Sequence, residues 1–188
     1  MKTIKTNTKT VPFRRKREGK TNYPRRMKIL ISSKLRLAVR FTGTKIIAQL
    51  IEFQPTGDKV LVAVDSSVLK KMGWNYSGKN FPAAYLTGLL IGKKSMAAGH
   101  TSAIFDVGQR TPLKGGKVCS FFKGVLDSGL DIPCDPSIFP SEERIRGVSI
   151  SSNLSAKESQ FTQYLKNGNK PEDIPSSFDK VKEKILAQ

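Results

Sequence analysis

The sequence has very little of the chemistry on which enzymes and metal sites depend. It contains one histidine, His100, and two cysteines, Cys119 and Cys134. A zinc site usually takes its ligands from Cys and His, and a nucleophilic triad needs a histidine beside the nucleophile. Neither is therefore predicted. Because no secretory signal is recognised, we expect the two thiols to be reduced and intracellular.

Clustered carboxylates and a phosphate-binding loop are missing as well. The segments 35–41 and 80–98 contain no acid, and Asp65, Asp106 and Asp127 are scattered. A metal-dependent nuclease, an alternative reading of this chain, would gather such acids around two ions. The glycines of 88–94 lack the full phosphate-loop pattern and lie inside an expected helix. We expect no enzyme activity, catalytic residue, metal, cofactor or small-molecule substrate.

No apolar run is long enough to cross a membrane. The longest, at 81–92, is too short and is followed by two lysines. A membrane surface would favour a basic amphipathic helix, which the basic segment described next does not form.

Positive charge is what the sequence has in excess. Lys and Arg number 33 against 15 acids, a net charge of +18, and residues 1–50 hold 15 of these cations against the single acid Glu18. Charge concentrated at one end of a chain is typical of nucleic-acid binding.

The densest basic segment is 13–28, with eight Lys/Arg and one acid. It has no apolar period, and Gly19 and Pro24 are expected to interrupt any helix. We expect residues 1–27, here called the basic arm, to be extended until a polyanion neutralises them. Phe13 and Tyr23 offer rings for stacking on bases. A solvated tail or a localisation signal is the alternative.

The rest of the chain predicts an α/β fold, a mixed sheet of about five strands flanked by helices. Expected strands cover 28–33, 35–41, 45–53, 59–64 (a central strand), 103–107 and 130–132, and the main helices cover 80–98 and 117–128. Small residues on one face of helix 80–98 (Ala84, Gly88, Gly92) should bring it close to the sheet. The predicted units are the arm 1–27, a core domain 28–146 and a tail 147–188 ending in a short helix on Phe178, Val181 and Ile185.

Arg36 and Arg40 alternate with apolar residues in the strand 35–41, so we expect both to face outward. Beside the arm they predict a second phosphate-contacting surface; ordinary solvated arginines are the alternative.

Three blocks of the sequence together resemble one family. Residues 13–23 (FRRKREGKTNY) are similar to the N-terminal signature of the archaeal and eukaryotic ribosomal proteins that bind 5S ribosomal RNA, the L-eighteen family, whose eukaryotic members are named L-five. Residues 83–90 (AAYLTGLL) and 122–133 (FKGVLDSGLDIP) resemble its later blocks, in family order.

The resemblance implies a structural constituent of the large subunit of the cytoplasmic ribosome, of archaeal type, with a ribonuclease-H-like sheet. Its partners would be 5S rRNA, large-subunit rRNA and neighbouring proteins of the central protuberance. An assembly factor outside the mature ribosome is the alternative. Bacterial relatives bind through the loop matching 108–117, which here lacks their Tyr and His. The complete set of expected RNA-binding residues is Arg14, Arg15, Lys16, Arg17, Lys20, Thr21, Tyr23, Arg25, Arg26, Lys28, Arg36, Arg40, Arg110, Lys114 and Lys117.

Overall fold

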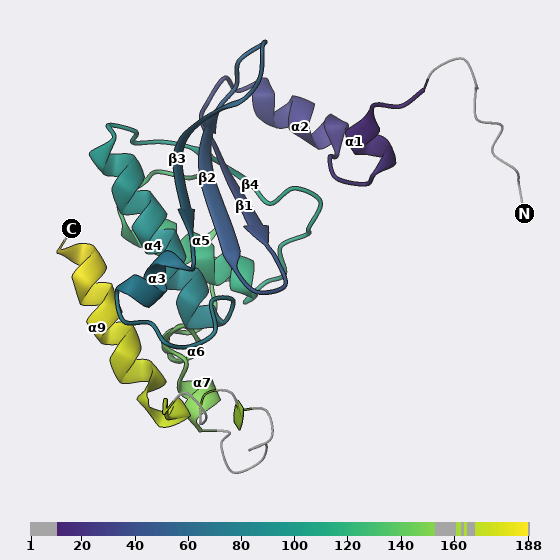
Figure 1. Ribbon diagram of the computed structural model, residues 1–188. Coiled ribbons are helices and arrows are strands. Elements are labelled where there is room, and N and C mark those ends of the chain that lie inside the picture. The colour runs from purple at the N-terminus through teal and green to yellow at the C-terminus, as the bar shows by residue number, and fades with distance from the viewer. Residues whose placement is uncertain (1–10, 153–160, 163, 165–167, 188) are drawn as a thin grey trace, which may run out of the picture.

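A mixed four-stranded sheet forms the centre of the fold (Figure 1). The computed structural model describes residues 11–152, 161–162, 164 and 168–187. The strands are β1 (Arg36–Phe41), β2 (Ile46–Glu52), β3 (Lys59–Asp65) and β4 (Ile104–Asp106), in the order β3-β2-β1-β4. β1, β2 and β3 form an antiparallel meander, and β4 pairs parallel to β1. The predicted α/β class is confirmed, although the strand expected at 130–132 is only a bridge between Ser102 and Asp131.

β3 lies at the edge of the sheet, so the prediction of a central strand covered on both faces is wrong. Val64 is buried, whereas Val60 is 45% exposed. The unbroken run of apolar residues suggested burial on both faces, but only one face of this edge strand is covered by helices.

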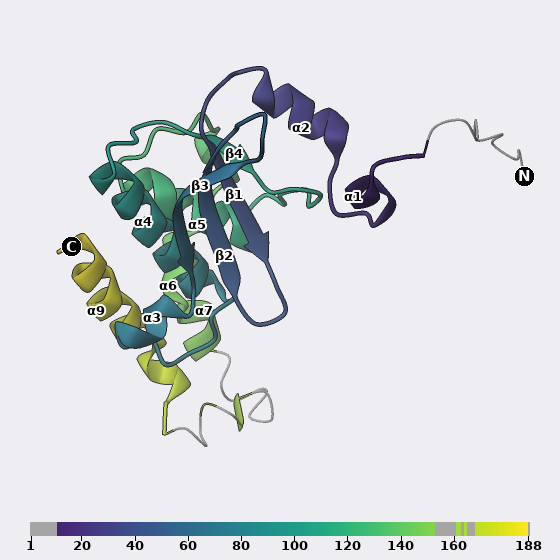
Figure 2. The same ribbon diagram turned by 45° about the horizontal axis from the view of Figure 1, so that its top comes forward.

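The helices α4 (Phe81–Ala97) and α5 (Lys117–Asp127) lie behind the sheet in Figures 1 and 2, close to the predicted ranges. The side chain of Asn80 caps α4 by accepting a 2.9 Å hydrogen bond from the amide of Ala83. Between these helices and the sheet, Leu37, Leu50, Leu86 and Phe121 are completely buried. A short helix, α3 (Val68–Lys71), connects β3 to this layer.

The glycines of α4 meet α5 instead of the sheet, which corrects the predicted role of its small residues. A Cβ atom at Gly88 would lie 2.1 Å from the carbonyl oxygen of Phe121, and one at Gly124 would lie 2.2 Å from that of Tyr85. Only glycine permits such a backbone approach. The two helices therefore pack as one unit, which also fixes the loop leading into α5.

The C-terminal part contributes to the core. It contains η1 (Pro136–Ile138), α6 (Glu142–Arg146), α7 (Val148–Ser151), η4 (Pro171–Asp173) and α9 (Ile174–Leu186). The predicted terminal helix is confirmed, with Phe178, Val181 and Ile185 buried in the main hydrophobic core. Packing therefore continues past residue 146, where the sequence suggested a tail.

The described part of the basic arm contains two helices, so the expectation of an extended segment is wrong. It forms α1 (Arg14–Arg17) and α2 (Tyr23–Leu30). Pro24 occupies the first turn of α2, where proline costs no hydrogen bond, and Asn22 caps that turn. The strand expected at 28–33 is also wrong, because α2 runs to Leu30 and crosses the boundary drawn at residue 27.

Candidate nucleic-acid interface

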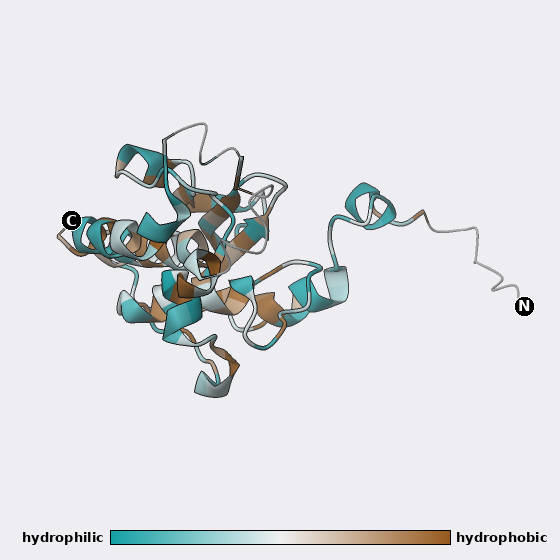
Figure 3. Ribbon diagram, turned by 90° about the horizontal axis from the view of Figure 1, so that it is seen from below, coloured by the Kyte–Doolittle hydropathy of each residue, from teal (hydrophilic) through white to brown (hydrophobic). Residues whose placement is uncertain are grey.

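α1 projects from the body of the protein and presents a hydrophilic surface, as Figure 3 shows. None of its residues is buried. Among the described residues, the one acid paired with this region is Glu18, which lies 3.7 Å from Arg14 and 2.8 Å from Lys20. Five exposed cations therefore surround one carboxylate: Arg14, Arg15, Lys16, Arg17 and Lys20. Such a surface attracts a polyanion.

The connection between α1 and α2 is held by contacts within the arm. The Nε of Arg15 donates a 2.8 Å hydrogen bond to the hydroxyl of Thr21. The rings of Phe13 and Tyr23 lie with their centroids 5.1 Å apart, and Phe13 remains 71% exposed. Thr21 and Tyr23 therefore shape the arm, while the ring of Phe13 is accessible for stacking.

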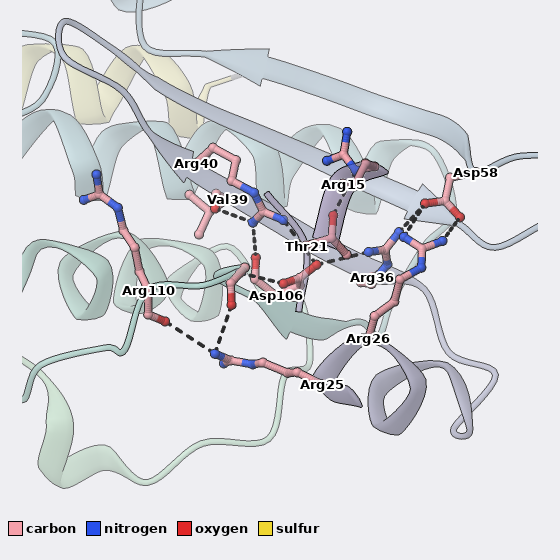
Figure 4. A network of polar contacts seen from close by, with 11 residues as sticks. Arg15, Thr21, Arg25, Arg26, Arg36, Val39, Arg40, Asp58, Asp106 and Arg110 are labelled. Carbon is pink, nitrogen blue, oxygen red and sulfur yellow. Dashed lines mark hydrogen bonds and ion pairs between the residues drawn. The ribbon is translucent and has the colours of Figure 1, made fainter. Parts of the chain in front are cut away.

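α2 is joined to the sheet by a group of ion pairs (Figure 4). Arg26 donates to both carboxylate oxygens of Asp58, at 2.9 and 2.8 Å. Arg36 donates to the same carboxylate at 2.6 Å and to Asp106 at 3.1 Å. Arg40 lies 3.4 Å from the carboxylate of Asp106. We call these five residues (Arg26, Arg36, Arg40, Asp58 and Asp106) the arginine–aspartate cluster.

The loop after β4 is attached to the same place. Arg25 donates to the carbonyl oxygens of Gly108, at 3.1 Å, and of Arg110, at 3.4 Å. The amide of Gly108 donates to Asp106 at 2.7 Å. Gly108 has φ +67°, and a Cβ there would lie 2.9 Å from Cζ of Arg40. Glycine therefore suits this position, because another residue would be strained at this positive φ.

The ion pairs determine the ionisation of Asp58. Its burial alone would raise the pKa, but hydrogen bonding to Arg26 and the positive charge of Arg36 outweigh this effect and lower the pKa below the ordinary value. Asp58 is therefore a carboxylate at neutral pH.

The expectation that Arg36 and Arg40 both face solvent is correct for only one of them. The side chain of Arg40 is 46% exposed, whereas that of Arg36 is 7% exposed. Both point away from the hydrophobic core, as the alternation predicted. Arg36, however, is enclosed by Asp58, Asp106 and the overlying α2, so its outer face is covered by protein.

Sequence reasoning missed the two aspartates. Asp106 pairs in register with Ala38, so it lies diagonally between Arg36 and Arg40 on one face of the sheet. The sequence does show an acid, Asp106, in one expected strand and two arginines in another. It does not show that these two strands pair in parallel, which is what brings the acid to the arginines. Asp58 follows a turn, where aspartate is common for local reasons.

A groove of about 630 Å³ lies between the arm and the outer face of the sheet. Its base includes Ala38, Gln49 and Ile51. Its walls carry two carboxylates, Asp58 and Asp106, and six cations: Arg15, Lys20, Arg25, Arg26, Arg36 and Arg40. The groove thus keeps a net positive charge after every ion pair is counted.

The other expected cations lie outside this groove. Lys28 is exposed on α2, and Arg110 bonds to the carbonyl of Phe41 at 3.0 Å. Lys114 and Lys117 are exposed but do not line the groove. The segment between them turns toward η1, where the amide of Gly115 donates to Ile138.

The carboxylates of the described chain are dispersed. Asp65 pairs with Lys45, and Asp127 accepts a hydrogen bond from Tyr85. Across residues 11–152 and the later described segments, no three His, Cys, Asp or Glu side chains are placed to hold a metal ion. Within the same residues, no helix has the length and apolar character needed to cross a bilayer.

Comparison with known proteins identifies the family. The model of the ribosomal large-subunit proteins 60S L5 and 50S L18 matches residues 8–102. The large ribosomal subunit protein uL18 of Korarchaeum cryptofilum is 45% identical over 183 residues, covering 94% of each chain. Its counterpart in Methanosphaera stadtmanae is 43% identical, covering 95% of each chain. Both relatives are archaeal, as the sequence resemblance suggested. The chain therefore belongs to the family of large-subunit ribosomal proteins 60S L5 and 50S L18, and so is a component of the cytoplasmic ribosome.

Proposed function

We propose that this protein binds 5S rRNA through the basic arm and the adjoining groove, and helps to anchor that RNA in the central protuberance. Large-subunit rRNA and neighbouring ribosomal proteins would be its further partners there. The observation that carries the proposal is the set of five exposed cations around α1, which one acid cannot neutralise. The family membership and the archaeal relatives support the ribosomal setting.

In this proposal the exposed arm cations contact successive backbone phosphates, because their side chains are free of buried partners. The ring of Phe13 stacks on a base, and Arg40 and Arg110 extend the contact surface along the sheet. Lys114 and Lys117 form a separate basic site at the start of α5. Arg36 supports this surface from beneath, since its two Nη groups are bound to carboxylates.

The proposed role is structural and involves no catalytic step. The arm supplies charge and stacking surface, and the core supplies a fixed position for the arm. Nothing in the proposed contacts requires a cofactor or a metal ion held by the protein.

A filter-binding titration tests the proposal. The purified chain should bind 5S rRNA at least about tenfold more tightly than an unrelated structured RNA of equal length at the same salt concentration. Replacing Arg14, Arg15, Lys16 and Arg17 by glutamine should remove most of that binding. Equal affinity for the two RNAs would contradict specific 5S recognition.

A second measurement addresses the alternative of an assembly factor. A ribosomal constituent should remain with large subunits when they are sedimented through a high-salt cushion. An assembly factor should leave the particle under those conditions.

A further inference from the structure

Two carboxylates lie inside a surface that we propose binds a polyanion. By charge alone, Asp58 and Asp106 should weaken RNA binding, since each adds a negative charge beside the groove. Asp106 is 8% exposed at the side chain and lies beneath the arginines. Asp58 is 25% exposed and lines the groove wall. Its position needs another explanation.

Asp58 is the residue through which the sheet holds α2 by ion pairing. It follows the turn between β2 and β3, and its carboxylate accepts three hydrogen bonds, two from Arg26 of α2 and one from Arg36 of β1. Within the described part of the chain, it is the one acid paired with a residue of α2.

Apolar packing alone does not fix α2 in place. None of its residues is fully buried, and Met27 is 63% exposed. The remaining long-range polar contacts of α2 are those of Arg25 to two loop carbonyls. A helix of eight residues is marginal on its own in water. Its orientation must therefore depend on the few groups that attach it.

We infer that Asp58 is a positioning residue for RNA recognition: it holds α2 against the sheet, so that α1 and the groove wall are already arranged for the RNA. The inference rests on the proposed function. It deepens that function by assigning a favourable role in RNA binding to a negatively charged residue.

The size of the effect follows from the population of the attached state. A bidentate, charge-assisted pair is among the stronger polar contacts, and its loss leaves Arg26 unpaired. If α2 is then attached for only about one tenth of the time, the apparent RNA affinity falls about tenfold, because only the attached state binds fully.

The test is Asp58→Asn, with Glu18→Gln as its matched control. Both changes remove one negative charge from the same basic region, but Glu18 pairs only with residues of the arm. We expect Asp58→Asn to weaken binding to 5S rRNA about tenfold. Glu18→Gln should leave binding equal or slightly tighter. Opposite signs from equal charge changes would separate positioning from electrostatics.

Amide hydrogen exchange in the free protein supplies a readout that needs no RNA. Asp58→Asn should speed exchange in α2 while α4 and α5 stay protected. Arg26→Lys, which keeps the charge but loses the planar fork, should reproduce the faster exchange and the weaker binding if Asp58→Asn fails to fold.

The binding and exchange results each support or overturn the positioning role of Asp58. Binding by Asp58→Asn as tight as that of the unchanged protein, or tighter, would overturn it while leaving the proposed function standing. Unchanged exchange in α2 would overturn it as well. If the unchanged protein does not prefer 5S rRNA, the proposed function itself fails, and the positioning role falls with it.

Discussion

The arginines of α1 and Arg36 of the arginine–aspartate cluster carry the same charge but differ in exposure and pairing. Arg14, Arg15 and Arg17 are exposed, with one partly paired to Glu18. Arg36 is buried with both Nη groups on carboxylates. The arginines of α1 keep their charge available for a partner, whereas the charge of Arg36 is neutralised by carboxylates within the fold. Residue type alone therefore does not distinguish a binding arginine from a structural one.

Salt concentration should have the largest effect, and it should act on RNA binding by the arm much more than on the attachment of α2. Raising salt from about 0.1 M to about 0.5 M should weaken 5S rRNA binding by about three orders of magnitude, with a log–log slope of roughly −4 to −5, if five or six cations contact phosphates. The attachment of α2 should change less, since partly buried pairs such as Arg26–Asp58 are screened less than exposed ones. Filter binding and hydrogen exchange at each salt concentration measure both. A flat binding curve would refute the electrostatic role of the arm.

Removing residues 1–20 should separate binding from stability. The deletion takes away eight cations and one acid but leaves Asn22 to cap α2. Affinity for 5S rRNA should fall by about two orders of magnitude. The melting temperature should stay nearly constant, because no described residue removed is buried. Binding within a few-fold of the full chain would shift the main contact to the sheet surface or to the loop 108–117.

Arg36→Ala should show the reverse pattern. It leaves Asp106 buried with weaker partners and should lower the free energy of unfolding by about 2–3 kcal/mol. Arg17→Ala, at an exposed position without a buried partner, is the control and should change stability by less than about 0.5 kcal/mol. Urea unfolding measures both. Equal stability of the two variants would mean that the buried pairs are replaceable by water.

Strong acid should release α2 from the sheet. Because the folded state lowers the pKa of Asp58, the stabilisation from this group is present above its unfolded pKa of about 3.9 and is lost as pH falls through the folded value. Hydrogen exchange or the NMR signals of Tyr23 should show detachment only at that acidic end. Asp58→Asn should lack this transition. Detachment between pH 5 and 7 would point to a different group.

The sequence was most informative where the signal is local. Asn80 and Pro82 predicted the start of α4, and the spacing of Phe178, Val181 and Ile185 predicted α9. The net charge of the arm predicted the exposed cations of α1. These features depend on neighbours within a few residues along the chain.

Features that depend on distant partners could not be predicted. Arg36 is buried because Asp58 and Asp106 approach it from segments 22 and 70 residues away. Gly88 was expected to contact the sheet, but it contacts α5. That contact could not be predicted, because the sequence does not show how the two helices cross. α2 was missed because Pro24 was read as a breaker, whereas after the capping residue Asn22 it begins a helix.

The place of α9 in the core sets an order of events during synthesis. Ile174, Phe178, Val181 and Ile185 fill the core beside α4, yet they are translated after every other described element. The arm is translated before its partner Asp58 exists. A nascent chain therefore carries a cationic segment that is not yet attached, and later a core that lacks the apolar side chains of α9. During that interval the exposed core is most open to aggregation, and completion of α9 ends this exposure.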